Sequence, residues 1–160
     1  SQLENREKVL ANRLNEITAN QFDYILIDCP PSLGMLSINA LTASDSVIIP
    51  MQSEFYALEG ISQLIETINR VTKGLNKNLV IEGVLLSMYD PRKNLHLEVA
   101  KELKNHFGAL VYRSTIPQNV RLAEAPSFGL PIYQFDPKCK GAEAFEDLVK
   151  EFLKKNKEKQ

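Results

Sequence analysis

Strand-like and helix-like segments alternate along this 160-residue chain, and this alternation limits its possible folds more than any other feature. Short apolar runs typical of buried strands are separated by longer segments in which apolar residues recur at helical spacing. Strands are predicted at 24–28, 46–51, 79–88 and 110–117, with 131–135 as a candidate fifth strand. Helices are predicted at 3–19, 36–43, 58–74, 99–107 and 145–153. This order is typical of a mostly parallel sheet with helices on both faces, which is a three-layer α/β fold.

The composition favours one globular domain in a reducing compartment. With 44% hydrophobic and 24% charged residues, the chain can bury a core. We assign residues 1–153 to the carboxyl-terminal part of a single domain and residues 154–160 to a basic tail. Cys29 and Cys139 form neither a disulfide framework nor a metal-ligand spacing, so a cytosolic location is expected. The longest apolar run is interrupted by Glu82 and no basic-then-apolar leader is seen, so neither export nor membrane insertion is expected.

Charge is distributed unevenly although the net charge is only −1. Residues 41–69 contain four acids and no base, whereas residues 92–121 contain six bases and two acids. A surface built from the second region would attract an anion even though the molecule as a whole would not.

Three polar segments directly follow predicted strands. These are Asp28 after "YILI", the turn "MYDPR" at 88–92, and "STIPQNVR" at 114–121. Ligands of parallel α/β sheets bind at the carboxyl ends of the strands, so the three segments are expected on one rim. Spacing alone leaves other interpretations open. Asp28 could equally end its strand or cap the next helix, and Met88 could be a core residue.

Five sequence strings, in this order, are similar to those of the ParA/Soj family of chromosome- and plasmid-partitioning ATPases, which are deviant-Walker P-loop proteins related to MinD. The similarity runs from Phe22 to Phe152. The strings are "DYILIDCPPSLG", "SEFYALEG", "MYDPRKNL", "IPQNVRLAEAPSFGLPI" and "DPKCKGAEAF". The resemblance implies a P-loop NTPase fold that binds ATP and Mg²⁺.

One family feature is absent from these 160 residues, because no GxxxxGK[ST] phosphate loop occurs in them. The second acidic motif, which normally precedes the "DYILID" strand, is also absent. We therefore expect an incomplete fold that lacks the amino-terminal P-loop unit, and a chain that does not hydrolyse ATP by itself. Exposed strand edges should make the isolated chain marginally stable or prone to self-association.

The resemblance implies which residues would contact ATP and Mg²⁺. Asp28 would be the Walker B carboxylate that orders a Mg²⁺-bound water, and Pro30 would stiffen the turn beside the terminal phosphate. Met88, Pro117 and Asn119 would surround the adenine base. Gln118 stands where relatives commonly carry arginine.

The resemblance also assigns a surface for double-stranded DNA, bound without sequence preference. Arg92 and Arg121 match positions where relatives carry basic residues that contact DNA, and Lys93 adds to the same region. Any one of these charges could instead be an ordinary solvated side chain. Phe128 and Leu130 replace residues that are often histidine and lysine in relatives, which lowers the positive charge.

The leading functional hypothesis is an ATP-switched homodimer that binds DNA and responds to a ParB/Spo0J-type partner, in the cytoplasm at the nucleoid. One alternative is a non-enzymatic remnant or regulatory interaction domain. Another is a MinD-like membrane-associated switch, which "DCPPSLG" and the polar tail disfavour. His96 and His106 are interpreted as ordinary surface or packing residues.

Overall fold

The computed structural model describes residues 5–17, 22–30, 32, 34–53 and 57–157. The chain divides into two compact units. The first unit comprises residues 1–47 and 59–82, and the second comprises residues 48–58 and 83–160.

The first unit contains helices, the starts of both strands and the segment 22–30, which has no regular structure. It contains the 3₁₀ turn η1 (Arg6–Lys8), α1 (Val9–Ile17), α2 (Met35–Ala43) and most of α3 (Ala57–Gly74). Buried Asn39 joins α2 to the first helices, because its amide donates to the Arg6 carbonyl at 2.8 Å and its Oδ1 accepts from the Leu10 N–H at 3.2 Å. The bounds of α2 and α3 confirm the predicted helices at 36–43 and 58–74 within one residue at each end.

The predicted strand at 24–28 is wrong, since residues 22–30 contain neither strand nor helix where described. Most of their apolar residues are exposed, with Tyr24 at 49% and Leu26 at 86%. A strand needs a neighbour that satisfies its backbone donors and acceptors, and the described strand pairing involves other residues. Apolar, β-prone side chains alone do not make the strand.

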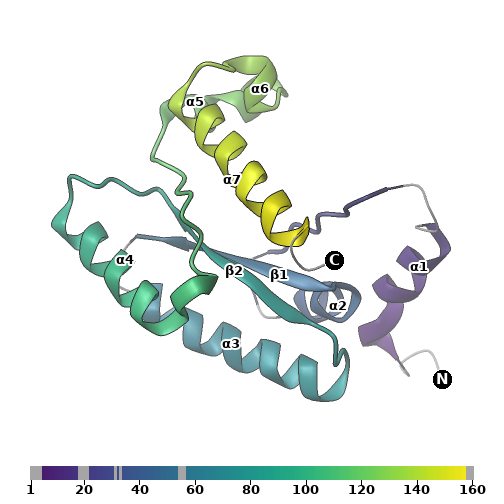
Figure 1. The fold of residues 1–160 in the computed structure, drawn as a ribbon. Helices are drawn as coiled ribbons and strands as arrows, with labels where there is room; N and C mark the ends of the chain where they lie inside the picture. The colour runs from purple at the N-terminus through teal and green to yellow at the C-terminus, as the bar shows by residue number, and fades with distance from the viewer. Residues whose placement is uncertain (1–4, 18–21, 31, 33, 54–56, 158–160) are drawn as a thin grey trace. The chain divides into compact units, whose positions relative to one another are not determined.

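The second unit contains the larger part of the paired strands β1 (Ser46–Gln52) and β2 (Val80–Ser87), which lie side by side in parallel (Figure 1). The predicted strand at 110–117 is not a continuous strand. It makes two isolated parallel bridges, Val84 with Val111 and Tyr89 with Pro117. It also donates two backbone hydrogen bonds to β2, from Tyr112 to the Val84 carbonyl and from Ile116 to the Leu86 carbonyl. The two segments approach each other closely at Gly83, where an added Cβ would lie 2.5 Å from the Tyr112 ring.

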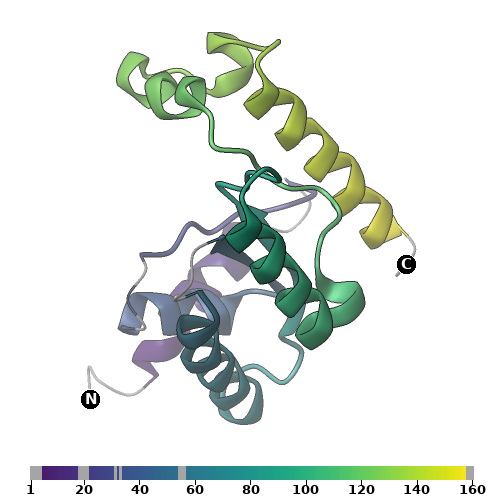
Figure 2. The same cartoon turned by 90° about the vertical axis from the view of Figure 1, so that its left-hand side faces the viewer.

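Helices complete the second unit. They are α4 (Asn94–Phe107), η2 (Gly108–Leu110), α5 (Val120–Glu124), η3 (Ala125–Phe128), α6 (Ile132–Phe135) and α7 (Lys140–Lys157). The short helices α5, η3 and α6 gather near the start of α7 (Figures 1 and 2), whereas η2 contacts α4. Phe145, Leu148 and Phe152 of α7 pack against a buried cluster of Leu85, Tyr112 and Ile116, as their helical spacing predicts.

Several elements differ from the sequence predictions, and α4 and α7 each begin five residues before their predicted starts at 99 and 145. The candidate strand at 131–135 is wrong, because Pro131 begins a helical turn and its carbonyl accepts from the N–H groups of Gln134 and Phe135. Proline suits a helix start, since it lacks the N–H that a helix start leaves unpaired. The final helix also continues to Lys157, so residues 154–157 of the predicted tail are helical. In the described residues, no helix is long and apolar enough to span a bilayer.

Candidate functional site

The end of β2 carries an unusual backbone conformation. Met88 has φ of 51°, which non-glycine residues seldom adopt. Such a conformation persists only where its surroundings impose it. Here the Ser87 hydroxyl donates to the Met51 carbonyl at 3.2 Å, and the Tyr89 N–H donates to the Ile116 carbonyl at 3.0 Å. The Met88 side chain is 51% exposed, so its interpretation as a core residue is wrong.

The structure brings together the two segments predicted to surround the base. Tyr89 pairs in parallel with Pro117, so the turn after β2 and the 116–119 loop are neighbours. Asn119 has a structural role that the sequence did not reveal. Its Oδ1 accepts from the Arg121 N–H at 2.8 Å and caps α5.

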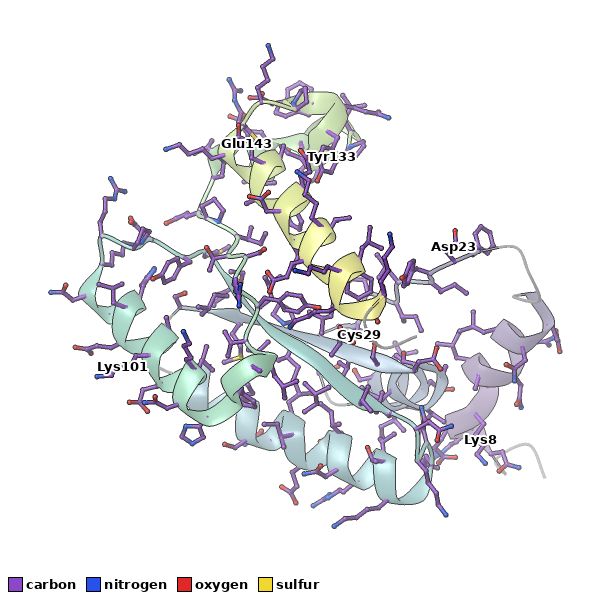
Figure 3. The ribbon with its side chains drawn as sticks, viewed as in Figure 1. Lys8, Asp23, Cys29, Lys101, Tyr133 and Glu143 are labelled. Atoms are coloured by element: carbon purple, nitrogen blue, oxygen red, sulfur yellow. The ribbon has the colours of Figure 1, made fainter. Side chains whose placement is uncertain are left out.

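A cavity of about 600 Å³ opens beside these loops. Tyr89 and Pro117 give it flat, largely apolar walls, which suit a planar ring. Polar groups converge on it from the 113–115 segment and from the start of α7, where Figure 3 labels Glu143. Of the predicted base-binding residues, Pro117 lines this cavity, whereas Met88 and Asn119 lie outside its lining.

Arg92 is held by the acid two residues before it. Its Nε and Nη2 each donate to the Asp90 carboxylate at 2.9 Å, and its backbone N–H donates to Oδ1 at 3.0 Å. These bonds hold the pKa of the Asp90 carboxyl well below its usual range and raise that of Arg92. The arginine side chain is nevertheless 87% exposed, so its outer face is open to solvent. Lys93, also exposed, immediately precedes α4 as its N-cap residue.

Arg121 is more heavily engaged than the sequence suggests. Its Nη1 bonds Glu124 at 2.9 Å, its Nε lies 3.4 Å from Asp136, and its Cζ lies 5.9 Å from the Phe135 ring centroid. The guanidinium therefore helps to join α5 to α6. The two carboxylates therefore partly neutralise the positive charge of Arg121 before any phosphate binds.

Asp28 and Pro30 lie in the first unit, in the segment without regular structure, and both are exposed. The Pro30 carbonyl accepts from the Ser37 hydroxyl at 3.5 Å, which ties this segment to α2. Burial, and secondarily the neighbouring Asp28 charge, raise the pKa of Cys29. The other predicted site residues belong to the second unit, so the shared rim stays a prediction.

Sequence reasoning missed two residues that shape the site. Glu151 binds the 113–114 backbone, and His96 accepts a hydrogen bond from the Asp90 N–H at 2.9 Å. Both lie on helices where a polar residue normally indicates a solvated face, so neither gave a signal.

Comparison with known proteins gives a consistent set of relatives. Residues 1–81 match a family model described as an AAA domain. The chain is 57% identical over 144 residues to the sporulation initiation inhibitor protein Soj of Bacillus subtilis, covering 90% of this chain and 57% of Soj. It is 49% identical over 152 residues to the chromosome partitioning protein ParA of Caulobacter vibrioides, covering 94% and 57%.

A solved structure shares the fold. Cobyrinic acid a,c-diamide synthase from Mycobacterium smegmatis, with a bound ATP analogue and magnesium, superimposes with a TM-score of 0.81 at 30% identity, covering 98% of this chain and 57% of that one. The chain thus has the helix-covered parallel sheet of P-loop NTPases in partial form. It spans a little over half the length of these relatives, 57% in each case.

Proposed function

The chain belongs to the ParA/Soj family of partitioning proteins, and its first half to the AAA domain family, and on this premise we propose that it is part of an ATP-dependent DNA-partitioning protein. The observation that supports the proposal best is structural. Two family strings distant in sequence, "MYDPRKNL" and "IPQNVRLAEAPSFGLPI", meet through the Tyr89–Ile116 hydrogen bond and the Tyr89–Pro117 bridge.

The residues present suit ATP and Mg²⁺. A single exposed carboxylate, Asp28, can hold one water of a Mg²⁺ ion, which keeps most of its waters in proteins. Pro117 and Tyr89 line a cavity within the usual size range of ligand sites, and Met88 is presented beside them. When bound, the magnesium nucleotide supplies the phosphoryl group that is transferred to water. Because the 160 residues contain no phosphate loop, hydrolysis is proposed for the full-length protein only.

DNA binding is proposed for the surface that carries Arg92, Lys93 and Arg121. Contacts with phosphates confer affinity without reading the sequence, as a protein that holds any stretch of chromosome requires. Arg92 meets this requirement best, since Asp90 orients its exposed guanidinium. We propose that ATP joins two subunits on DNA at the nucleoid, and that a ParB/Spo0J-type partner promotes their release.

Magnesium-dependent ATP turnover by the full-length protein tests the nucleotide assignment. Asp28→Ala should reduce turnover by at least about tenfold, since a carboxylate that orders the metal-bound water is lost. Asp23→Ala is the matched control, because Asp23 is an exposed acid of the same segment (Figure 3). Undiminished turnover in Asp28→Ala, or an equal loss in both variants, would remove Asp28 from the site.

A second candidate function is a regulatory interaction domain that uses no nucleotide. The exposed apolar side chains of Phe22, Tyr24 and Leu26 favour it, since a surface of this kind commonly contacts another protein. Nucleotide binding measured by calorimetry separates the two, because only the partitioning protein should take up ATP. A MinD-like membrane-associated switch is the third possibility, and flotation with anionic vesicles in the presence of ATP would reveal it.

A further inference from the structure

We propose that His96 is a positioning residue that holds Arg92 in place for DNA, an inference that depends on the proposed function. His96 lies in the first turn of α4 and is 7% exposed, whereas its neighbours Leu95 and Leu97 are 40% and 46% exposed. The helix thus turns the histidine inward, on the buried face with Val99, and leaves two leucines outside. A buried polar ring on an apolar face needs a hydrogen-bond partner.

The partner is the turn that carries Arg92. The Asp90 N–H donates to His96 Nδ1 at 2.9 Å. Because the donor is a backbone amide, Nδ1 must be unprotonated, and the neutral ring carries its proton on Nε2. The Tyr89 ring lies beside it, with the two ring centroids 6.1 Å apart. His96 therefore holds the turn at the residue that in turn holds Arg92.

A second set of contacts links the Asp90 turn to the exposed guanidinium of Arg92. The backbone of Asp90 is fixed by His96 on one side, and the preceding Tyr89 N–H is fixed by the Ile116 carbonyl at 3.0 Å. The Asp90 carboxylate, so placed, accepts from the Nε and Nη2 atoms of Arg92. An arginine side chain loses conformational freedom when it binds a phosphate, so fixing the guanidinium beforehand lowers the cost of binding.

Two substitutions separate this role from packing. His96→Leu fills similar space but leaves the Asp90 N–H without its acceptor. His96→Asn restores an acceptor, since Asn Oδ1 and His Nδ1 are both attached to Cγ. His106→Leu is the matched control, because His106 is an exposed histidine near the end of the same helix.

Amide hydrogen exchange of the full-length protein measures the tether without DNA. Protection of the Asp90 amide should fall about tenfold in His96→Leu and stay near wild type in His96→Asn and His106→Leu. Equal protection in His96→Leu and wild type would overturn the proposal, because the bond would then hold nothing in place.

Affinity for random-sequence duplex DNA with ATP measures the consequence. His96→Leu should weaken binding about fivefold, the effect of one hydrogen bond, and His96→Asn should recover most of it. In an Arg92→Ala background, His96→Leu should cause no further loss. An undiminished affinity in His96→Leu while Arg92→Ala weakens binding would overturn the proposal and leave the proposed function intact. Unchanged binding in Arg92→Ala, or no binding by the wild type, would refute the use of Arg92 itself and the positioning role with it.

Discussion

Glu151 of α7 accepts a hydrogen bond from the backbone at Ser114. Its Oε2 accepts from the Ser114 N–H at 2.8 Å and from the Ser114 hydroxyl at 2.7 Å, while Oε1 accepts from the Arg113 N–H at 2.9 Å. This explains why the 110–117 segment is not a continuous strand. The Tyr112 N–H donates to the Val84 carbonyl, and the Ile116 N–H donates to the Leu86 carbonyl. An advance of four residues along this segment thus matches an advance of only two along β2. The extra residues form a bulge, and Glu151 accepts hydrogen bonds from Arg113 and Ser114 within it.

This carboxylate should matter for stability. Glu151→Ala removes the acceptor of three donors, and we expect a loss of about 2 kcal/mol in the free energy of unfolding. Urea denaturation followed by circular dichroism measures it. Glu146→Ala is the control, because Glu146 pairs with Lys150 on the exposed face of the same helix, where an ion pair is worth about 0–1 kcal/mol. Equal losses in the two variants would contradict the role of Glu151.

The same site predicts a pH dependence. Burial raises the pKa of Glu151, but the hydrogen bonds from Arg113 and Ser114 outweigh it, so the pKa lies below its usual value of 4.5. A lowered folded-state pKa stabilises the protein above the unfolded-state pKa, and this contribution is lost as pH falls through the folded-state value. The stability advantage of wild type over Glu151→Gln should therefore be complete at neutral pH and shrink below about pH 4.5. A constant difference down to pH 3 would refute this assignment.

Exposed apolar side chains near Tyr24 should promote association of the 160-residue chain. Leu26, which is 86% exposed in a segment that pairs with no strand among the described residues, is the side chain to change. Leu26→Glu should shift sedimentation velocity profiles towards the monomer. Leu36→Glu tests whether any charge suffices, since Leu36 is 72% exposed on α2. A wild-type chain that sediments as a sharp monomer would count against the prediction.

Salt dependence tests the two arginines assigned to DNA. Each phosphate contact contributes about 0.9 to the slope of log affinity against log salt, so Arg92→Ala with Arg121→Ala should lower the slope by about 2. Each arginine should contribute about half of this change, since Arg92 and Arg121 are both already paired with acids. Arg70→Ala is the control, as this exposed arginine is also paired with an acid, Glu66. A slope that the double variant leaves unchanged would remove both arginines from the interface.

The sequence predicted those parts of the fold that depend on local pattern. The stripe on α7 and the end of α4 at Gly108 follow from spacing and from the left-handed backbone that glycine permits. What failed depended on partners distant in sequence. Residues 24–28 have strand-like side chains but no neighbouring strand in the described chain, and "PIYQF" contains β-prone residues although Pro131 caps the start of a helix.

Prediction of the site was limited in the same way. The Met88 and Pro117 segments meet as the order of strands and the family resemblance led us to expect. The pairing of Arg121 with Asp136, and the acceptors on Glu151 and His96, are tertiary contacts that one sequence does not specify. A charged residue on a helix predicts solvent exposure unless the fold places a donor opposite it.

ATP-dependent DNA binding by the full-length protein tests the central claim most directly. With Mg²⁺ and a slowly hydrolysed ATP analogue, the protein should bind random-sequence duplexes as a dimer, with an affinity that falls steeply as salt increases. With ADP it should bind far more weakly. Equal DNA affinity in ATP analogue, ADP and nucleotide-free solutions would contradict the account, whatever the affinity itself.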